Sequence, residues 1–373
     1  MRDLDVVDAP FPGGVVVVSP AAETRLLRVR ITGATGYGVR QTAGSLHARD
    51  VTVEGTRLVR GATLPCGPTY DLWPVPFEVY SRGDASAILH SFVDAGPRGE
   101  AVLAAGAVLC APIVRDAFDQ ISVATLFGHD DLPFSGLAPL LPILPILADA
   151  GTGVYVSGAA TEGHVFIGLR VQYAERAGVI VSGPMTSATF LDLGIAFTQH
   201  DPALGSITVQ QAAKGGSSFG GLEARFGAEV GIVDALVVAN DVAGIHVHSG
   251  ANALTLDGIK ILATHEVAFA DGPGFGDGLL VIEASVGLLK SSTIKSNQRA
   301  GVLVNSSSAF AASIEFKNSF SSNNKFGLVT QGPHTVLTPS AWQTELHTEG
   351  NPGGNLSDGA LAVPDPVAKP PPP

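Results

Sequence analysis

The feature that most constrains the fold is a pattern repeated in the second half of the sequence. Residues 237–247, 294–304 and 320–329 share it: an apolar residue, two further residues, an Asn, three residues, a Gly, and then a short alternating run. The Asn residues are Asn240, Asn297 and Asn323, and in each copy the Gly follows four positions later. A pattern this regular predicts a stack of similar structural units.

Degenerate copies extend the pattern toward the N-terminus. Thr198 and Thr264 stand where the Asn is expected, and residues 29–32 and 51–54 look like two early units. Neighbouring copies lie 22 to 26 residues apart, for example from 32 to 54 and from 297 to 323. Two longer steps, from 198 to 240 and from 264 to 297, contain the loop-like runs 215–218 and 271–277.

A coil of three short β-strands and three turns accounts for this spacing. Successive coils stack at about 4.8 Å with in-register hydrogen bonds, so residues one repeat apart lie directly above one another. A turn Asn can bond to the Asn of the next coil, and a Gly after it permits the backbone conformation that a corner requires. The composition agrees, because 45 Gly, 25 Pro and only 15% charged residues suit many short strands better than long amphipathic helices.

The Asn-x-x-x-Gly spacing followed by an alternating strand resembles the repeat of right-handed parallel β-helix proteins, the pectate-lyase-like superfold. The resemblance covers roughly residues 13–61 and 150–335. It implies an all-β fold, a right-handed parallel β-helix of roughly 9–11 coils with long excursions from some turns. An antiparallel β-sandwich or a leucine-rich repeat fits the period and the turn Asn less well. The superfold hosts lyases, hydrolases, epimerases, tail-spike proteins and binding surfaces, so the resemblance assigns no activity.

The sequence divides into one large domain and two terminal segments. We expect a single β-helix domain over residues 1–335, in which 62–150 form irregular coils and a long excursion with an aromatic, proline-rich start. That start either lines a ligand groove or covers the flank of the solenoid, the second being favoured. Residues 336–360 are expected to cap the last coil, and residues 361–373 are expected to be a disordered Pro-rich tail.

Charge and cysteine content limit the possible partners. The net charge of −12 disfavours a nucleic-acid surface. The apolar run 137–147 is too short and too rich in Pro to cross a membrane. Cys66 and Cys110 can form one disulfide in an exported protein, the alternative being two buried thiols, and neither has the spacing of a zinc site. We expect an extracellular or cell-surface protein, although no signal peptide is visible in this sequence.

One polar cluster is the main candidate for chemistry. Strand alternation turns His246 and His248 away from the core, and the coil before them offers Glu223 and Arg225 at the equivalent outward positions. Two His and a carboxylate could form an acid–base group or a weak metal site, with Arg225 in support. The favoured interpretation is plainer: a solvated sheet face with cross-strand pairs.

Other acidic and histidine-containing segments are weaker candidates. His129-Asp130-Asp131 and His200-Asp201 occupy expected turns or excursions, where such groups are usually only solvated. The acidic calcium ligands of the superfold's lyases and the Asp clusters of its hydrolases are not evident in the sequence.

The function favoured by these observations is a non-enzymatic exported or surface β-helix that presents an extended face, with a polysaccharide or cell-surface matrix as the possible partner. The alternative is a carbohydrate-active enzyme, a polysaccharide lyase or glycoside hydrolase working in a groove on the β-helix. A structural fragment of a longer surface protein is a third interpretation. No cofactor or metal is expected, with calcium considered only for a lyase. The sequence leaves the oligomeric state open.

Overall fold

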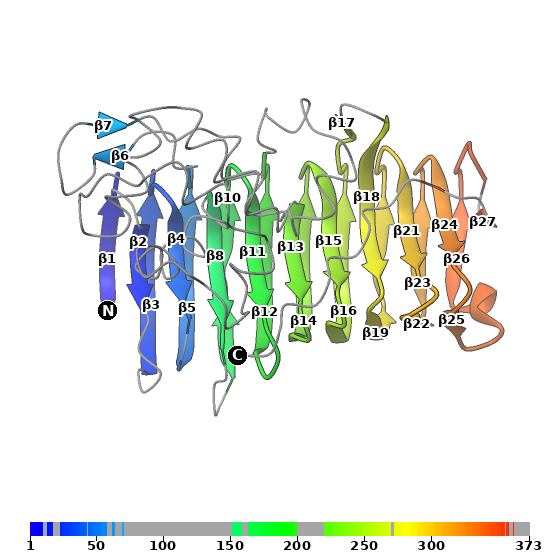
Figure 1. Ribbon diagram of the computed structural model, residues 1–373, viewed down its shortest axis with the longest axis horizontal. Coiled ribbons are helices and arrows are strands. Elements are labelled where there is room, and N and C mark those ends of the chain that lie inside the picture. Colours follow the sequence, from blue (N-terminus) through cyan, green and yellow to red (C-terminus); the bar gives the residue numbers. More distant parts are fainter. Residues whose placement is uncertain are drawn as a thin grey trace, which may run out of the picture.

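The computed structural model describes residues 1–9, 13–17, 23–42, 44–57, 62–63, 69–70, 151–158, 163–199, 220–269, 272–354, 356–357 and 361. In these residues the regular structure is β, apart from one short 3-10 turn at Trp342–Thr344. The strands lie side by side in chain order along one long axis (Figure 1). Cys66, Cys110, the segments 129–131 and 200–201, the run 215–218 and residues 362–373 lie outside the described part of the chain.

Two large parallel sheets form the body of the molecule. Sheet A is made of β1 (Arg2–Val7), β3 (Glu23–Thr32), β5 (Ser45–Glu54), β9 (His164–Ile167), β10 (Arg170–Gln172), β12 (Ser187–Ala196), β14 (Glu229–Val238), β16 (Asn252–Leu262), β19 (Ser285–Lys290), β20 (Thr293–Lys295), β22 (Ala312–Lys317), β23 (Ser319–Ser322), β25 (Thr335–Thr338) and β26 (Leu346–Glu349).

Sheet B is made of β2 (Gly13–Val17), β4 (Tyr37–Gln41), β8 (Thr152–Ser157), β11 (Ala177–Ser182), β13 (Gly220–Arg225), β15 (Val242–His248), β18 (Gly272–Ile282), β21 (Ala300–Asn305), β24 (Phe326–Gln331) and β27 (Leu356–Ser357). The short strand β17 (Val267–Phe269) joins it antiparallel to β18. A separate two-stranded antiparallel ribbon consists of β6 (Ala62–Thr63) and β7 (Thr69–Tyr70).

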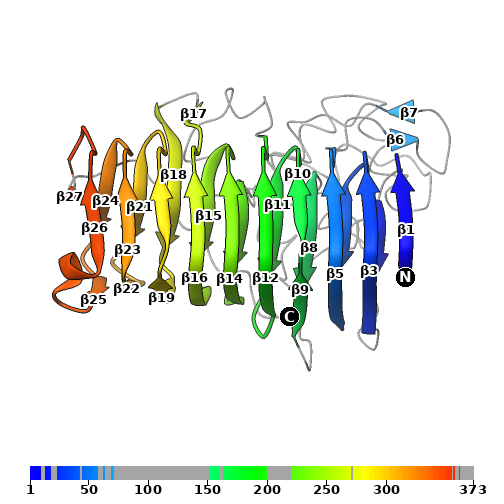
Figure 2. The same cartoon turned by 180° about the vertical axis from the view of Figure 1, so that it is seen from behind.

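Each coil contributes one strand to sheet B and one long or interrupted strand to sheet A. Every neighbouring pair along the ten strands of sheet B is parallel. The ten strands correspond to ten coils in the described residues, within the nine to eleven predicted. The all-β parallel β-helix architecture is therefore confirmed, and Figure 2 shows the stacked strands of sheet A from the other side.

Sheet A bends in the middle of each coil, which gives the coil its third flat side. The bend falls at a residue with left-handed φ, such as Arg28, Asp50, Asp192 or Asp234, whose φ values lie between 50° and 56°. These positions are in register from coil to coil. Asp and Asn adopt this conformation at lower cost than most residues. The sequence predicted three short strands per coil. The structure has them where sheet A is interrupted, as at β9 and β10 or β19 and β20, and elsewhere two of them are halves of one bent strand.

The core is a row of β-branched and aliphatic side chains between the two sheets. On sheet B, Val179, Leu222 and Ile245 point inward from consecutive coils, and all are fully buried. Phe166 and Phe190 face them from sheet A and stack on each other at 4.8 Å. Burying each such side chain stabilises the fold by roughly 1.5–3 kcal/mol, so the repeated apolar positions account for the solenoid.

A ladder of side-chain amides runs along one corner of the stack. Asn240 Oδ1 accepts hydrogen bonds from the backbone N and Oγ1 of Thr198 at 3.1 and 2.9 Å. Asn297 Oδ1 accepts from the backbone N of Thr264 at 3.0 Å. The backbone N and Nδ2 of Asn297 in turn donate to Asn324 Oδ1, both at 2.9 Å. Four of the five expected ladder residues, Thr198, Asn240, Thr264 and Asn297, thus lie at one structural position.

The fifth expected ladder residue, Asn323, is wrong by one position. The ladder passes through Asn324, whose backbone N donates to Asn351 Oδ1 at 2.9 Å, while Asn323 is exposed at the corner before it with φ 54°. The error arose because the Asn-to-Gly offset was taken as constant. Gly301 and Gly327 are in register, but the corner that ends at Gly327 is one residue shorter.

The repeat Gly forms a second column, at the start of the inward-facing part of sheet B. Nine glycines are in register, Gly14, Gly38, Gly153, Gly178, Gly221, Gly244, Gly278, Gly301 and Gly327. A Cβ on Gly178 would lie 2.6 Å from Ile195 Cγ2 and 2.5 Å from the carbonyl O of Gly221. Only Gly therefore fits at these positions, because sheet A side chains and the next coil fill the volume that the methyl group of an Ala would need.

Between described strands, the longest connections from sheet A to sheet B begin at the corner between the ladder and sheet B. The chain departs after Arg57, Gln199 and His265, and the next sheet B strands begin at Thr152, Gly220 and Gly272. All three departures follow coils with Thr at the ladder position, whereas the Asn coils have short corners. Strands β6, β7 and β17 lie along this edge in Figure 1.

The solenoid also continues beyond the predicted boundaries. Strands β25 and β26 pair in parallel with β22 and β23, so residues 335–349 form part of a further coil where the sequence predicted a cap. The loop-like run 271–277 contains the start of β18, which pairs antiparallel with β17. Leu361, placed in the expected tail, exchanges two backbone hydrogen bonds with the side-chain amide of Gln331 at 2.8 and 3.0 Å.

Candidate functional site

The candidate cluster lies on the outer side of sheet B, at the two coils that contain β13 and β15. The alternation of both strands turns Leu222 and Ile245 inward and the next residue of each outward. The register places Glu223 opposite His246. The sequence predicted this juxtaposition from the repeat, because stacked coils bring equivalent positions to one strand separation.

The surroundings of the cluster differ from the expectation. Glu223 is fully buried, and Arg225, His246 and His248 are 5–6% exposed, so they do not form a solvated sheet face. Other outward residues of sheet B are also buried, among them Ile180, Leu280, Leu303 and Val329. Alternation tells which side of a sheet a residue occupies, but carries no information on whether that side meets solvent.

Glu223 is the centre of the hydrogen bonding. Its Oε1 accepts from Arg225 Nη1 at 3.1 Å and lies 2.9 Å from His248 Nε2. Because a carboxylate only accepts, Nε2 carries the proton of His248. Nδ1 of the same ring lies 2.9 Å from Ser249 Oγ. A chain of contacts therefore runs from Ser249 through the imidazole to the buried carboxylate.

Aromatic contacts hold the two imidazoles in place. The rings of His246 and His248 stack at 4.2 Å with an interplanar angle of 18°. Phe226 meets His248 edge-on at 6.2 Å and lies 5.2 Å below the guanidinium of Arg225. Arg225 Nε also donates to Ser182 Oγ on the preceding coil at 3.2 Å. These contacts pack the cluster on several sides and orient its side chains.

Burial and charge fix the protonation states in the cluster. Burial alone would raise the pKa of Glu223, but the Arg225 guanidinium and the hydrogen bond from His248 outweigh it, so the pKa is lowered and the group is a carboxylate. Burial, aided by the neighbouring His248, holds the pKa of His246 well below its ordinary value. His246 is therefore a neutral imidazole.

Two atoms of the cluster are left without partners. Glu223 Oε2 and His246 Nε2 are buried and make no hydrogen bond. Leaving such a group unsatisfied costs roughly 1–3 kcal/mol, and more for a charged one. Both atoms therefore keep unused capacity for a hydrogen bond or a coordinate bond.

A second buried ion pair lies two coils further along the same sheet and was not found from the sequence. Arg299 Nε donates to Asp277 Oδ1 at 2.9 Å, and the guanidinium lies 4.4 Å from the ring centre of Phe275. The backbone N of Ala300 also donates to the same carboxylate oxygen. Asp277 stood at the end of a glycine-rich run that was interpreted as a loop, which hid its position on a strand. Ser249 was missed because it follows the strand, at a corner.

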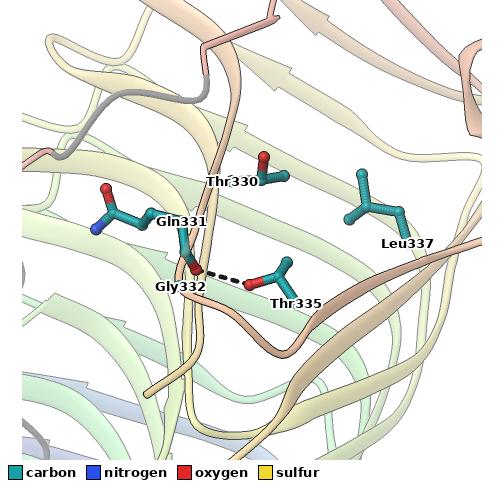
Figure 3. Close-up of a pocket in the computed structure, with 5 residues that line it drawn as sticks. All are labelled: Thr330, Gln331, Gly332, Thr335 and Leu337. Carbon is teal, nitrogen blue, oxygen red and sulfur yellow. Dashed lines mark hydrogen bonds between the residues drawn. The ribbon is translucent and has the colours of Figure 1, made fainter. Parts of the chain in front are cut away.

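One pocket on the described residues lies well away from this cluster, at the corner between β24 and β25. Thr330, Gln331, Gly332, Thr335 and Leu337 line it, and its volume is about 330 Å³ (Figure 3). Thr335 Oγ1 donates to the carbonyl O of Gln331 at 2.7 Å. None of these described lining residues is titratable, so they offer hydrogen-bonding groups but no acid–base chemistry.

The fold defines the chain as a parallel β-helix protein with a sealed Glu–Arg–His–His cluster. Comparisons with protein-family models, with curated proteins and with solved structures give no match. In the described residues, no helix is long and apolar enough to span a bilayer.

Proposed function

We propose that this chain is a non-catalytic, exported or cell-surface β-helix of the pectate-lyase-like kind that binds a neutral polysaccharide on the outer face of sheet A. The asparagine ladder and the glycine column support the superfold assignment. The observation that carries the function is an exposed apolar patch on three consecutive coils. This sheet A patch consists of Ile167, Tyr173, Leu191, Phe197, Val233 and Leu236, which are 37–45% exposed.

One column of the sheet A patch runs across the coils. Ile167, Leu191 and Val233 are in register on β9, β12 and β14. Charged residues border this column, with Arg49 on the preceding coil and the ion pair of Asp257 and Lys290 on the following ones. Tyr173, Phe197 and Leu236 lie beyond the bend of sheet A, on the other side of the exposed ion pair of Arg170 and Asp192. Exposed apolar surfaces next to polar residues are typical of binding sites.

Two aromatic rings favour a sugar polymer as the partner. Tyr173 and Phe197 stand at one corner, stacked at 5.2 Å and within 9° of parallel. The same corner carries Gly55 and Ala239 on the adjoining coils, so small residues leave room beside each ring. Flat aromatic surfaces of this kind stack on the apolar C–H face of a pyranose. The net charge of −12 disfavours an acidic polymer, which leaves a neutral one.

The burial of the cluster of Glu223, Arg225, His246 and His248 supports the proposal that the chain is not an enzyme. Glycoside hydrolases use two carboxyl groups on either side of the scissile bond. Among the described residues, Glu223 is the one carboxylate of the cluster, and it is fully buried. A carbohydrate-active enzyme is the second candidate, favoured by the chain of contacts from Ser249 through His248 to Glu223.

The test is a panel of neutral and acidic polysaccharides, assayed for binding by affinity electrophoresis and for products as reducing ends and unsaturated sugars, with and without calcium. We expect binding of a neutral polymer without products, and loss of that binding in the Tyr173→Ala/Phe197→Ala variant. Ala is already accommodated at this corner, as Ala239 and Ala263 show, so the variant should fold. Phe310→Ala, which removes another exposed ring, is the control.

Each part of the proposal can fail separately. Polymer cleavage abolished by His248→Ala would establish the enzyme instead. Binding that survives in the double variant would overturn the sheet A patch as the binding surface. Binding of acidic polymers only would overturn the choice of a neutral ligand.

A further inference from the structure

We propose that Glu223, His246 and His248 form a binding site for a divalent transition-metal ion of the zinc class, which cross-links two neighbouring coils. The inference concerns the outer side of sheet B and is independent of the polysaccharide proposal for sheet A. It replaces the sequence-based expectation that the chain holds no metal.

The donor set is the first argument. His246 and His248 are two residues apart on β15, so both imidazoles project from the same side of the strand, and Glu223 projects beside them from β13. One ligand atom from each of the three residues lies within 4.8 Å of the others. Two imidazoles and a carboxylate suit zinc and its transition-metal neighbours, whereas calcium and magnesium require mostly oxygen ligands.

The unpartnered atoms are the second, independent argument. Glu223 Oε2 and His246 Nε2 are the two atoms of the cluster that could coordinate a metal ion and are buried without a hydrogen bond. They come from different strands and lie in the same cluster. A bound cation would satisfy both atoms at once, and it would convert an unfavourable buried arrangement into two coordinate bonds.

The size of the site fits with a small adjustment. Zn–N and Zn–O bonds of about 2.0–2.2 Å place the ligands of a tetrahedral ion roughly 3.3 Å apart. The three ligand atoms lie within 4.8 Å of one another, so the most widely separated pair must close by at most about 1.5 Å. Rotation of the Glu223 carboxylate and small shifts of the imidazoles can supply this movement. With three protein ligands, a water molecule completes the coordination.

The neighbours of the three ligands act as outer-shell groups. Arg225 binds Glu223 Oε1 and leaves Oε2 free. To coordinate through Nε2, His248 gives up its hydrogen bond to Glu223 and carries its proton on Nδ1, which faces Ser249 Oγ. Such contacts orient metal ligands and tune their affinity. The positive charge of Arg225 opposes a cation, so the affinity is expected to be lower than that of a closed structural zinc site.

The experiment uses the untagged full chain after removal of metal with a chelator. Cobalt(II) is titrated as the probe, its visible absorption reports the coordination geometry, and zinc is then added as competitor. We expect one cobalt per chain, displacement by zinc, and a higher melting temperature for the loaded protein. His246→Gln should weaken the Kd at least about tenfold. The control is His265→Gln, because His265 forms a comparable but exposed contact with Asp241 at 3.1 Å.

The outcomes separate clearly. Absence of cobalt bands up to millimolar metal, or binding that is equally strong in His246→Gln and the wild type, overturns the proposal. If His246→Gln does not fold, Glu223→Gln serves as the second variant, since it keeps the shape and one oxygen acceptor. X-ray absorption of the zinc-loaded wild type is a further readout that needs no variant. A spectrum without histidine scattering overturns the site.

Discussion

The glycine column makes the sharpest prediction about stability. In Gly244→Ala, the added Cβ would lie 2.3 Å from Ile261 Cγ2 and 2.7 Å from the carbonyl O of Gly278. Carbon atoms in contact normally stand about 3.5–4.0 Å apart, so sheet A and the neighbouring coil must separate by roughly 1 Å. Overpacking of this kind typically costs about 1–3 kcal/mol. Ala also restricts the unfolded chain more than Gly does, and this offsets about 0.4–1 kcal/mol of the overpacking cost.

We therefore expect Gly244→Ala to lower the free energy of unfolding by about 1–2 kcal/mol. Equilibrium unfolding in urea, followed by far-UV circular dichroism, measures the change. The matched control is Gly231→Ala on β14, where the nearest atom to the added Cβ is 4.0 Å away. This control should change the stability by less than about 0.5 kcal/mol or increase it.

A double-mutant cycle tests the cause. Ile261→Ala removes the Cγ2 that the new methyl group would meet, so the cost of Gly244→Ala should fall by about 1 kcal/mol or more in that background. If Gly244→Ala is as stable as the wild type, the column is not a packing requirement. If the two changes are simply additive, the collision with Ile261 is not its source.

Three further predictions concern polar groups. Asn324→Ala should cost about 2 kcal/mol in a urea titration because it breaks the ladder, whereas Asn323→Gly should change the stability by less than about 0.5 kcal/mol; equal effects would contradict the corrected ladder. Burial lowers the pKa of His164 to about 4, so between pH 6.5 and 4 the unfolded chain binds this proton more strongly than the folded one. The free energy of unfolding should therefore fall as the pH drops through that window. His164→Gln should remove this part of the pH dependence, and an unchanged pH profile in the variant would exclude His164 as its source. Asp277→Asn should cost about 3 kcal/mol in melting experiments because it weakens the buried pair with Arg299; a loss below about 1 kcal/mol would show that the guanidinium is satisfied by other groups.

The sequence predicted the parts of the fold that repeat. The spacing of Asn240, Asn297 and their Thr equivalents led to the parallel coils, because in-register stacking makes identical positions neighbours. The same reasoning placed Glu223 opposite His246, and the structure has this pair in register. Periodicity was sufficient wherever a residue's environment is set by the residue one coil away.

The remaining features depend on information that a period does not carry. Corners vary in length, so the ladder residue was assigned to Asn323 although Asn324 holds the position. The outer side of sheet B is buried, and this covering depends on contacts outside the repeat. The sheet A patch was also missed, because exposed apolar residues in the middle of a strand look like core residues in a sequence. Residues 335–349 lost the repeat pattern while keeping the parallel pairing.

The departure of the longest connections from a single corner has a consequence for how such a chain can change. The ladder fixes one side of that corner and the glycine column fixes the other, so the number of residues between them does not alter how the strands pair. Segments of very different length can be exchanged there while the scaffold keeps its register. Replacing residues 200–219 by one residue, which reproduces the four-position step from Asn240 to Gly244, should leave a folded solenoid. New sequences grafted at Arg57, Gln199 or His265 would project from the same edge.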